Sequence, residues 1–472
     1  MRSASSSGMM LAKRVEMLRV DSFRAGFARV DITPPLGTPI VGYFEERYAQ
    51  GVLDNLEANA LALSDGERTA ILIAADLLGI EGVAFNAALR QRIAAAAGIP
   101  AEAVYVHSTH THTGPGAGKA DAGRTNLFDG TDFYNEFLAT RLSDVARFAV
   151  ADLTSATLAI GRAEAKRISF LRRYRMKDGS IRTNPGINNP DIVEPVGNLD
   201  ETVQVLRIRR GGADDIAVVN FATHPDVVGG EMISGDWPAF ARRTFERAEP
   251  GAKCIFFNGA QGDVNHVCTD PKPGEREGLH PDFDDVDRGY EHARHMGRVV
   301  AAAALSVWGK CEPVAAGKLR FAVRTISVPS QMPKPEELHQ AREYDRLHRE
   351  GRDAEIPFTG MALTTVVAEA GRMVLLADGP EAFDLPLSAV AIGDAVAFAG
   401  IPGEPFTEIG RAVKAQAPFK MTLCTCLTNG SCGYFPVASA YDEGGYEARS
   451  SVFAASVAAD IVAGHDAILR QL

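Results

Sequence analysis

The sequence predicts an α/β fold in which mixed β-sheets are flanked by helices. Short runs of β-branched and aliphatic residues alternate with helical patterns through most of the 472 residues. This alternation is typical of βαβ units, in which a helix joins two parallel strands. Polar side chains, several of them histidines, come directly after the apolar runs. Ligands of open α/β sheets bind beyond the carboxyl ends of the strands, so these side chains are the first candidates for a site.

The earliest clear unit consists of a strand, a helix and a second strand. The unbroken apolar run RTAILIAADL (68–77) predicts a buried strand. FNAALRQRIAAAAG (85–98) predicts a helix that ends before Pro100, and AVYVHST (103–109) predicts the next strand.

The same pattern continues toward the C-terminus. Helical periodicity predicts helices at 237–248, 288–308 and 334–351, the last of them charged and exposed. Apolar runs predict strands at 216–223 and 253–259, and two strands around a Gly-Asp turn at 388–400. We expect residues 21–472 to form one domain.

Composition and charge exclude several classes of partner. The 49 basic and 60 acidic residues give a net charge of −11, and no basic stripe of the kind that binds nucleic acid is present. No apolar run approaches the roughly 20 residues that a membrane helix needs, and residues 1–20 lack the apolar region of a secretory signal. We therefore expect a disordered tail at 1–20, a cytoplasmic location, and neither nucleic acid nor an integral membrane segment. The sequence does not predict the oligomeric state.

Three histidines lie within VHSTHTHTGPGAG (106–118), at the end of a predicted strand. If the strand continues that far, His110 and His112 project from one face and His107 from the other. Two imidazoles on one face repel each other when charged, and a metal ion keeps them neutral. Zinc takes about four N, O or S ligands and keeps one position open in catalytic sites. The alternative is a pair of buried, hydrogen-bonded histidines.

Four polar residues follow separate apolar strands: His110, His224, Asn265 and Glu404. Loops at strand ends can bring such residues to one site. A rival site, the phosphate loop suggested by GPGAGKAD (114–121), lacks the required residues because Ala120 follows the lysine.

Several segments, in order along the chain, together resemble the neutral/alkaline ceramidase family. They are GFARVDITPPLGTPIVGY (26–43), DNLEANALAL (54–63), THTHTGPG (109–116), NGAQGDVN (258–265), IPGEP (401–405) and the Tyr-rich GYFPVASAYDEGGYEARSSVF (433–453). The resemblance runs from about residue 23 to the C-terminus. It implies a ceramidase-like catalytic domain and zinc-dependent amidase activity.

The resemblance also implies a ligand set. The family holds zinc with the first histidine of T-H-T-H, a histidine after a later strand, the glutamate of P-G-E and a late tyrosine. On this chain these residues are His110, His224, Glu404 and Tyr434. The second histidine of T-H-T-H, His112, is expected beside the metal and facing the substrate.

Two departures from the family pattern bear on mechanism and substrate. The family's G-D-V-S-P-N is GDVNHV (262–267) here, so Asn265 stands at a serine position and a serine nucleophile is impossible there. Asn265 is then expected to position the substrate. The family's C-terminal immunoglobulin-like domain is not expected, and we expect a small soluble substrate instead of ceramide.

A local excess of positive charge occurs in LRRYRMKDGSIRTNPG (171–186). Guanidinium groups bind carboxylate or phosphate in a two-pronged fashion, so Arg173 and Arg175 are candidates for binding an anionic substrate group. The alternative is a solvated hairpin with KDGS as its turn.

The predicted function is hydrolysis of an amide, or of a related ester or lactone, by water that zinc activates. His112 and Tyr434 would donate hydrogen bonds to the developing oxyanion. Two other classes stay open: a metal-dependent lyase or isomerase at the same site, in which His112 moves a proton, and a non-catalytic binding protein.

Overall fold

The computed structural model describes residues 23–121, 128–284 and 286–472. The tail predicted at 1–20 lies outside them. The largest sheet contains, in spatial order, β16 (Ala252–Asn258), β14 (Asp215–Phe221), β13 (Thr202–Arg210), β8 (Thr154–Glu164), β1 (Arg24–Asp31), β5 (Glu57–Ser64), β6 (Thr69–Ala75) and β7 (Val104–Ser108), with β20 (Glu312–Val314) paired to β8. Only β14–β16 and β6–β7 are parallel in this sheet, so the sheet is mixed as predicted.

A second, four-stranded sheet packs on one face of the first. Its order is β21 (Leu319–Pro329), β22 (Ala382–Ile392), β23 (Val396–Gly400) and β25 (Met421–Thr425). Side chains from the two sheets form one buried apolar cluster, in which Leu61 and Phe257 of the large sheet join Val390, Phe398 and Leu423 of the small one. This shared layer removes the largest aromatic and aliphatic groups from water and fixes the two sheets relative to each other.

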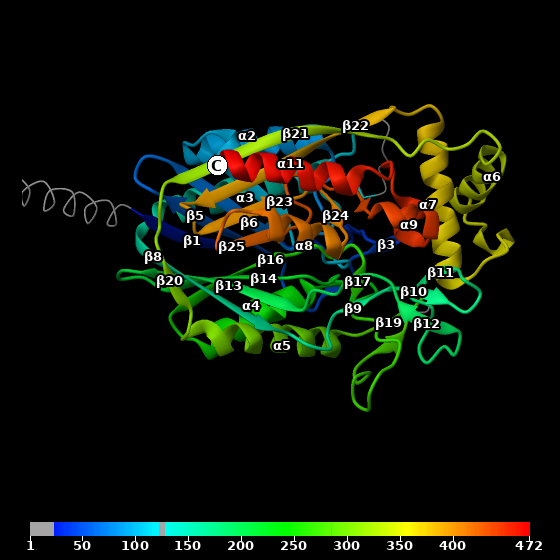
Figure 1. Cartoon of the computed structure of the whole chain (residues 1–472), viewed down its shortest axis with the longest axis horizontal. Helices are drawn as coiled ribbons and strands as arrows, with labels where there is room; N and C mark the ends of the chain where they lie inside the picture. Colours follow the sequence, from blue (N-terminus) through cyan, green and yellow to red (C-terminus); the bar gives the residue numbers. More distant parts are fainter. Residues whose placement is uncertain (1–22, 122–127, 285) are drawn as a thin grey trace, which may run out of the picture.

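Helices cover the outer faces of both sheets (Figure 1). Two pairs of helices cover the large sheet, and each pair forms an apolar cluster with it. The first pair is α2 (Val83–Ala97) and α3 (Asp132–Ala151), and the second is α4 (Asp236–Ala248) and α5 (Tyr290–Trp308). The small sheet is covered by α8 (Thr407–Gln416) and α11 (Val457–Gln471). The result is a helix–sheet–sheet–helix arrangement, and the strands and helices predicted at 68–109, 216–259, 288–308 and 388–400 are all present.

A helical hairpin extends from one end of the molecule, where it is yellow in Figure 1. It consists of α6 (Leu338–Arg349), which matches the charged helix predicted at 334–351, and α7 (Gly360–Ala377), which the sequence analysis missed. Among the helices of the described residues, α7 alone is long and apolar enough to cross a membrane. The core helix of a globular protein can have the same length and composition, and 44% of α7 is buried here. The short helices α9 (Ala438–Glu443) and α10 (Tyr446–Ser450) lie beside it.

Short ribbons shape the loops at the strand ends. The pairs are β2 (Pro39–Ile40) with β3 (Arg47–Tyr48), β4 (Gly51–Val52) with β15 (Met232–Ile233), β9 (Phe170–Leu171) with β17 (Val264–Asn265), β18 (His280–Pro281) with β19 (Asp287–Arg288), and β24 (Glu404–Pro405) with β26 (Tyr434–Phe435). A three-stranded ribbon contains β10 (Arg173–Met176), β11 (Ile181–Thr183) and β12 (Ile192–Pro195), so the hairpin predicted around KDGS is present. Two 3₁₀ turns occupy Ala101–Ala103 and Asp353–Glu355.

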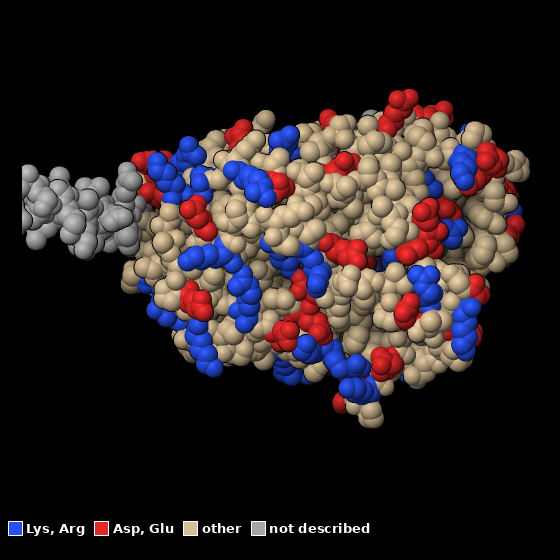
Figure 2. All heavy atoms as spheres, in the orientation of Figure 1, with Lys and Arg blue, Asp and Glu red and all other residues tan. Residues whose placement is uncertain are grey.

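Cationic and anionic side chains are interspersed on the face seen in Figure 2. No stripe of one sign is visible on that face. The expectation that nucleic acid is not a partner remains a prediction.

His107 joins the ends of strands from both sheets. Its ring is fully buried, its Nδ1 lies 2.7 Å from the carbonyl oxygen of Cys426, and its Nε2 accepts from the Asn258 backbone N–H at 2.9 Å. Because a carbonyl only accepts, the ring carries its proton on Nδ1 and both nitrogens are satisfied. The strand ends at Ser108, before His110 and His112, so the alternation expected if it continued does not apply to them, and His107 acts as a structural joint.

We expect the pH dependence of stability to report this joint. Burial lowers the pKa of His107 to about 3, whereas an unfolded histidine titrates at about 6.5. The unfolded chain binds more protons between these values, so the stability contributed by His107 is complete above about pH 6.5 and is lost as the pH falls toward 3. His107→Gln keeps a donor and an acceptor but does not titrate. Urea denaturation from pH 7 to 4 should therefore show a flatter dependence of unfolding free energy on pH in this variant. An unchanged slope would contradict the assignment, and exposed His339→Gln serves as the control.

Candidate metal centre

The candidate residues follow strands that end at the same side of the two sheets. His110 and His112 come after β7, and His224 comes after β14, which are both in the large sheet. Glu404 follows β23 of the small sheet and forms β24, which pairs in parallel with β26 so that Glu404 stands opposite Tyr434. The structure therefore brings together residues separated by about three hundred positions, as the strand-end pattern predicted.

Three imidazoles and one carboxylate converge at short distances. His110 Nε2 lies 3.1 Å from His224 Nε2 and 3.3 Å from His112 Nε2. Glu404 Oε2 lies 3.2 Å from His110 Nε2 and 3.4 Å from His224 Nε2. Within the described residues, these three histidines are the one group of three or more His, Cys, Asp or Glu side chains close enough together to hold a metal ion.

The outer nitrogens of two of these rings are fixed by backbone carbonyls. His110 Nδ1 donates to the Leu78 oxygen at 2.6 Å, and His224 Nδ1 donates to the Gln261 oxygen at 3.2 Å. Each carbonyl can only accept, so each neutral ring carries its proton on Nδ1 and directs the lone pair of Nε2 inward. Two lone pairs and the Glu404 carboxylate then face one another in a buried space. A proton or a metal ion relieves this repulsion, and imidazole nitrogens with a carboxylate oxygen form a donor set that binds divalent metal ions.

The electrostatic surroundings keep these groups in the forms that bind metal. Burial, followed by the charge of Arg172, holds the pKa of His224 well below its usual range. Burial also lowers the pKa of His112 to about 3, against the opposing effect of Asp226. Burial alone would raise the pKa of Glu404, but His110 lowers it, so the carboxylate is ionised. Neutral His112 and His224 rings and a charged Glu404 carboxylate are the protonation states that metal binding requires.

His110 has a backbone conformation that is rare for a side chain with a Cβ. Its φ is +81°, in the left-handed region that favours glycine. Such strain persists only where surrounding contacts impose it, here the Leu77 carbonyl that binds the His110 N–H at 2.8 Å and the Leu78 carbonyl on the ring. The strain turns the imidazole toward His224.

Tyr434 lies against the cluster, as the resemblance implied. Its ring stacks on His224 with centroids 6.4 Å apart, and burial and Glu404 hold the pKa of its phenol well above the usual range. Two neighbours that the sequence analysis did not assign to the site complete this side. The Arg172 guanidinium lies 5.3 Å from the Tyr434 ring, and the Tyr446 ring lies 5.5 Å from it. Arg172 is fixed by Glu447, whose Oε1 is 2.5 Å from its Nε.

Asn265 is buried near the centre but its amide is already engaged. Its Nδ2 donates to Asn184 Oδ1 at 3.1 Å, and its Oδ1 accepts from the Val267 N–H at 3.0 Å. It follows Val264, whose carbonyl binds the His224 N–H at 3.2 Å. These contacts place Asn265 in the support of the His224 loop, and its role in positioning substrate remains a prediction.

The two arginines predicted to bind an anion each contact a carboxylate of the chain. Arg173 is almost fully buried, and its Nη2 lies 3.1 Å from Glu443. Arg175 Nη2 lies 3.7 Å from the same glutamate, and its Nε lies 3.5 Å from Glu194. The anion-binding role stays a prediction, which these ion pairs do not favour.

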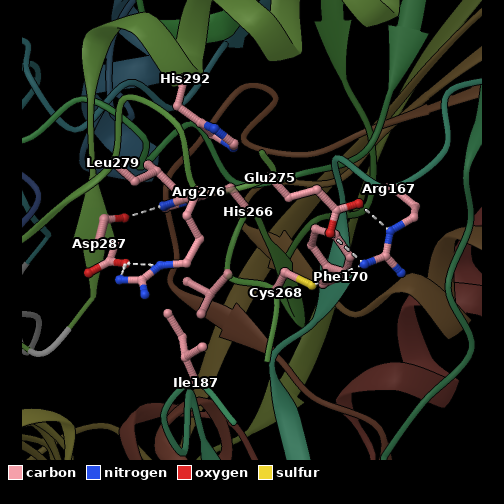
Figure 3. A pocket seen from close by; sticks show the side chains of 11 residues that line it. Arg167, Phe170, Ile187, His266, Cys268, Glu275, Arg276, Leu279, Asp287 and His292 are labelled. Atoms are coloured by element: carbon pink, nitrogen blue, oxygen red, sulfur yellow. Dashed lines mark hydrogen bonds and ion pairs between the residues drawn. The ribbon is translucent and has the colours of Figure 1, made fainter. Parts of the chain in front are cut away.

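A cavity with an empty volume of about 370 Å³ lies next to Asn265, and Figure 3 shows its walls. The arginines in its wall are neutralised: Arg167 Nε lies 2.6 Å from Glu275, and Arg276 Nη2 lies 2.5 Å from Asp287. None of the candidate metal ligands lines this cavity, so it is separate from the metal cluster. The lining consists of Arg167, Phe170, Ile187, His266, Val267, Cys268, Glu275, Arg276, Leu279, Asp287 and His292.

Comparison of the fold with solved structures identifies it as that of bacterial neutral ceramidase. The crystal structure of neutral ceramidase from Pseudomonas aeruginosa superposes with a TM-score of 0.70 at 19% sequence identity, over 96% of this chain and 75% of that one. A ceramidase complexed with C2 gives the same TM-score and identity, over 96% and 76% of the two chains. No family model matches the sequence, and no curated protein matches it either. The ceramidase-like α/β fold predicted from the sequence is therefore confirmed.

We expect the purified protein to contain about one divalent metal ion per chain, and the double variant His110→Ala/His224→Ala to lose it. The reason is the inward lone pairs of these two rings. Elemental analysis after exhaustive dialysis measures the metal. The double variant His292→Ala/His295→Ala is the matched control, because these two rings lie 5.9 Å apart on α5, outside the cluster. Full metal content in the first double variant would contradict the site.

Proposed function

We propose that the protein is a zinc-dependent hydrolase that cleaves an amide bond, or a related ester or lactone, by attack of water. The observation that carries the proposal is the inward convergence of His110 Nε2, His224 Nε2 and Glu404 Oε2 within 3.1 to 3.4 Å of one another. The fold shared with neutral ceramidase supports an amide among the bonds that such a site could cleave.

Different residues of the chain would take different roles in the reaction. His110, His224, Glu404 and Tyr434 would hold the zinc ion, which would lower the pKa of bound water to about 7 and polarise a carbonyl oxygen. The Tyr434 hydroxyl would donate to the oxygen that gains negative charge, a contribution of roughly 3–4 kcal/mol where such donors have been removed. His112 directs Nε2 into the same space, where it holds or moves a proton.

The proposed substrate is small and soluble. The support for it is that the Arg172 guanidinium lies beside Tyr434, where an anionic group would share it with Glu447, and ceramide has no anionic group that would use this charge. Burial alone would lower the pKa of Arg172, but Tyr434 and Glu447 raise it, so the guanidinium stays charged.

Replacement of the candidate ligand Glu404 is expected to reduce catalytic activity much more than replacement of its neighbour Asn265. Glu404→Gln should reduce kcat/KM at least about 100-fold, because it removes the anionic oxygen from the metal cluster. Asn265→Ala should keep at least about a tenth of wild-type activity, since no serine nucleophile exists at that position. Steady-state kinetics with metal analysis of each variant measure this. If Asn265→Ala retains its metal but loses all activity, the proposed mechanism of water attack lacks an essential residue.

Substrate choice is tested with a panel of acyl compounds. Carboxylate-bearing amides, esters and lactones are compared with ceramide in detergent by kcat/KM. We expect a small anionic compound to be the best substrate, because it could share the buried Arg172 guanidinium with Glu447, which ceramide cannot do. Ceramide as the best substrate would overturn the proposed substrate class and leave the zinc mechanism standing.

A further inference from the structure

A carboxylate that the sequence analysis did not single out faces the outer nitrogen of His112. Asp226, two residues after His224, places Oδ1 3.8 Å from His112 Nδ1. The two side chains are only 13% and 10% exposed. His110 and His224 each have a backbone carbonyl at Nδ1, so His112 alone in the cluster has a charged group at that position.

Two side chains bind the Asp226 carboxylate, and a third fixes the backbone that follows it. Arg288 donates from Nε to Oδ1 at 2.9 Å and from Nη2 to Oδ2 at 3.0 Å. The Tyr43 hydroxyl donates to Oδ1 as well. The following backbone is fixed by Asp236, whose Oδ2 accepts from the N–H groups of Val227 and Val228, each at 2.9 Å. A carboxylate with this many partners keeps its position when a neighbouring group changes.

The His112 ring is held in the plane that faces Asp226. Gly42 packs directly on it: a Cβ at this position would lie 2.8 Å from Nδ1, and the φ of +117° requires glycine. The Tyr43 ring covers the imidazole at a centroid distance of 5.4 Å, and Arg47 Nη2 donates to the His112 carbonyl at 2.9 Å. The ring therefore presents Nδ1 to Asp226 and Nε2 to the metal cluster.

Two tautomers of His112 compete. With the proton on Nε2, the ring would donate to His110 Nε2, 3.3 Å away, whose lone pair also faces the cluster. With the proton on Nδ1, the ring would face the Asp226 carboxylate, which at 3.8 Å lies beyond hydrogen-bond distance and leaves Nδ1 without a hydrogen-bond partner in this structure, and Nε2 would direct a lone pair inward. A fixed negative charge beside Nδ1 favours the second tautomer, and a cation in the cluster opposes the first.

We propose that Asp226 is a positioning residue that keeps the proton of His112 on Nδ1, so that Nε2 is free to accept a proton from the attacking water. This rests on the hydrolysis proposed above. The water gives its proton to Nε2 as its oxygen bonds to the carbonyl carbon. The imidazolium formed then returns that proton to the leaving nitrogen or oxygen as the C–N or C–O bond breaks. The Asp226 carboxylate compensates the imidazolium charge. The distance of 3.8 Å between His112 Nδ1 and Asp226 Oδ1 is expected to shorten when substrate binds, as catalytic hydrogen bonds do.

The tautomer can be read without any substrate. Zinc-loaded protein with ¹⁵N-labelled histidines is compared with its Asp226→Asn variant by NMR of the ring nitrogens, since protonated and lone-pair nitrogens have distinct ¹⁵N shifts. We expect His112 to carry its proton on Nδ1 in the wild type and to shift toward Nε2–H in the variant. Asp284→Asn is the matched control: Arg288 Nη1 and Nη2 bind Asp284 at 2.6 and 2.8 Å, so the same ion network is weakened without a change at His112.

Kinetics provide the second readout. Asp226→Asn is expected to lower kcat about 10- to 100-fold with KM and metal content nearly unchanged, whereas Asp284→Asn stays close to wild type and Asp226→Glu recovers part of kcat. An unchanged His112 tautomer in Asp226→Asn overturns the proposal, and so does an equal loss in Asp284→Asn, which would make the whole Arg288 network structural. If no acyl compound is hydrolysed by the wild type, the proposed function fails, while the NMR comparison still decides the placement of the proton.

Discussion

The geometry of the candidate metal centre depends on one buried seam between the two sheets. His107, at the end of a strand in the large sheet, binds the Cys426 carbonyl just beyond a strand of the small sheet. The seam continues where the Asn258 carbonyl accepts from the Cys426 N–H at 3.1 Å and where Asn220 Nδ2 donates to the Cys424 carbonyl at 3.1 Å. The histidine ligands arise from the large sheet, and Glu404 and Tyr434 arise from the small one. A centre assembled from both sheets keeps its distances only if the sheets cannot slide, and a satisfied polar seam in a water-poor interior supplies that rigidity.

The groups of the candidate metal centre destabilise the metal-free fold locally. Lone pairs of His110 and His224 and the charge of Glu404 face one another, and the backbone of His110 is held at a positive φ. Both features raise the energy of the metal-free fold, and the packed core between the sheets offsets them. Binding of a cation then relieves the repulsion. Metal affinity and folding stability are therefore linked, and the protein should be more stable when loaded.

Much of the fold and most of the candidate site residues could be predicted from the sequence, because the ends of buried strands can be recognised in it. Each buried strand is a short apolar run, and the polar residue that follows it, such as His110, His224 or Glu404, inherits its position from the sheet. What could not be predicted depends on contacts between distant segments. Arg172 reaches the centre whereas Arg173 turns to Glu443, and adjacent positions in the sequence carry no sign of that difference. The Asp226 carboxylate was equally hidden, although its place two residues after a ligand was a usable signal.

The α6–α7 hairpin is inserted between β21 and β22, two strands that pair directly with each other along eleven positions. The sheet therefore closes whether the connection is long or short. Yet α7 reaches the site indirectly, because Glu369 on α7 binds Arg449 of α10 at 2.9 Å, and α10 carries Tyr446. The length of the connection is thus decoupled from the register of the sheet. Shortening the hairpin would leave β21 and β22 paired and would remove the Glu369 contact that holds α10 and, with it, Tyr446.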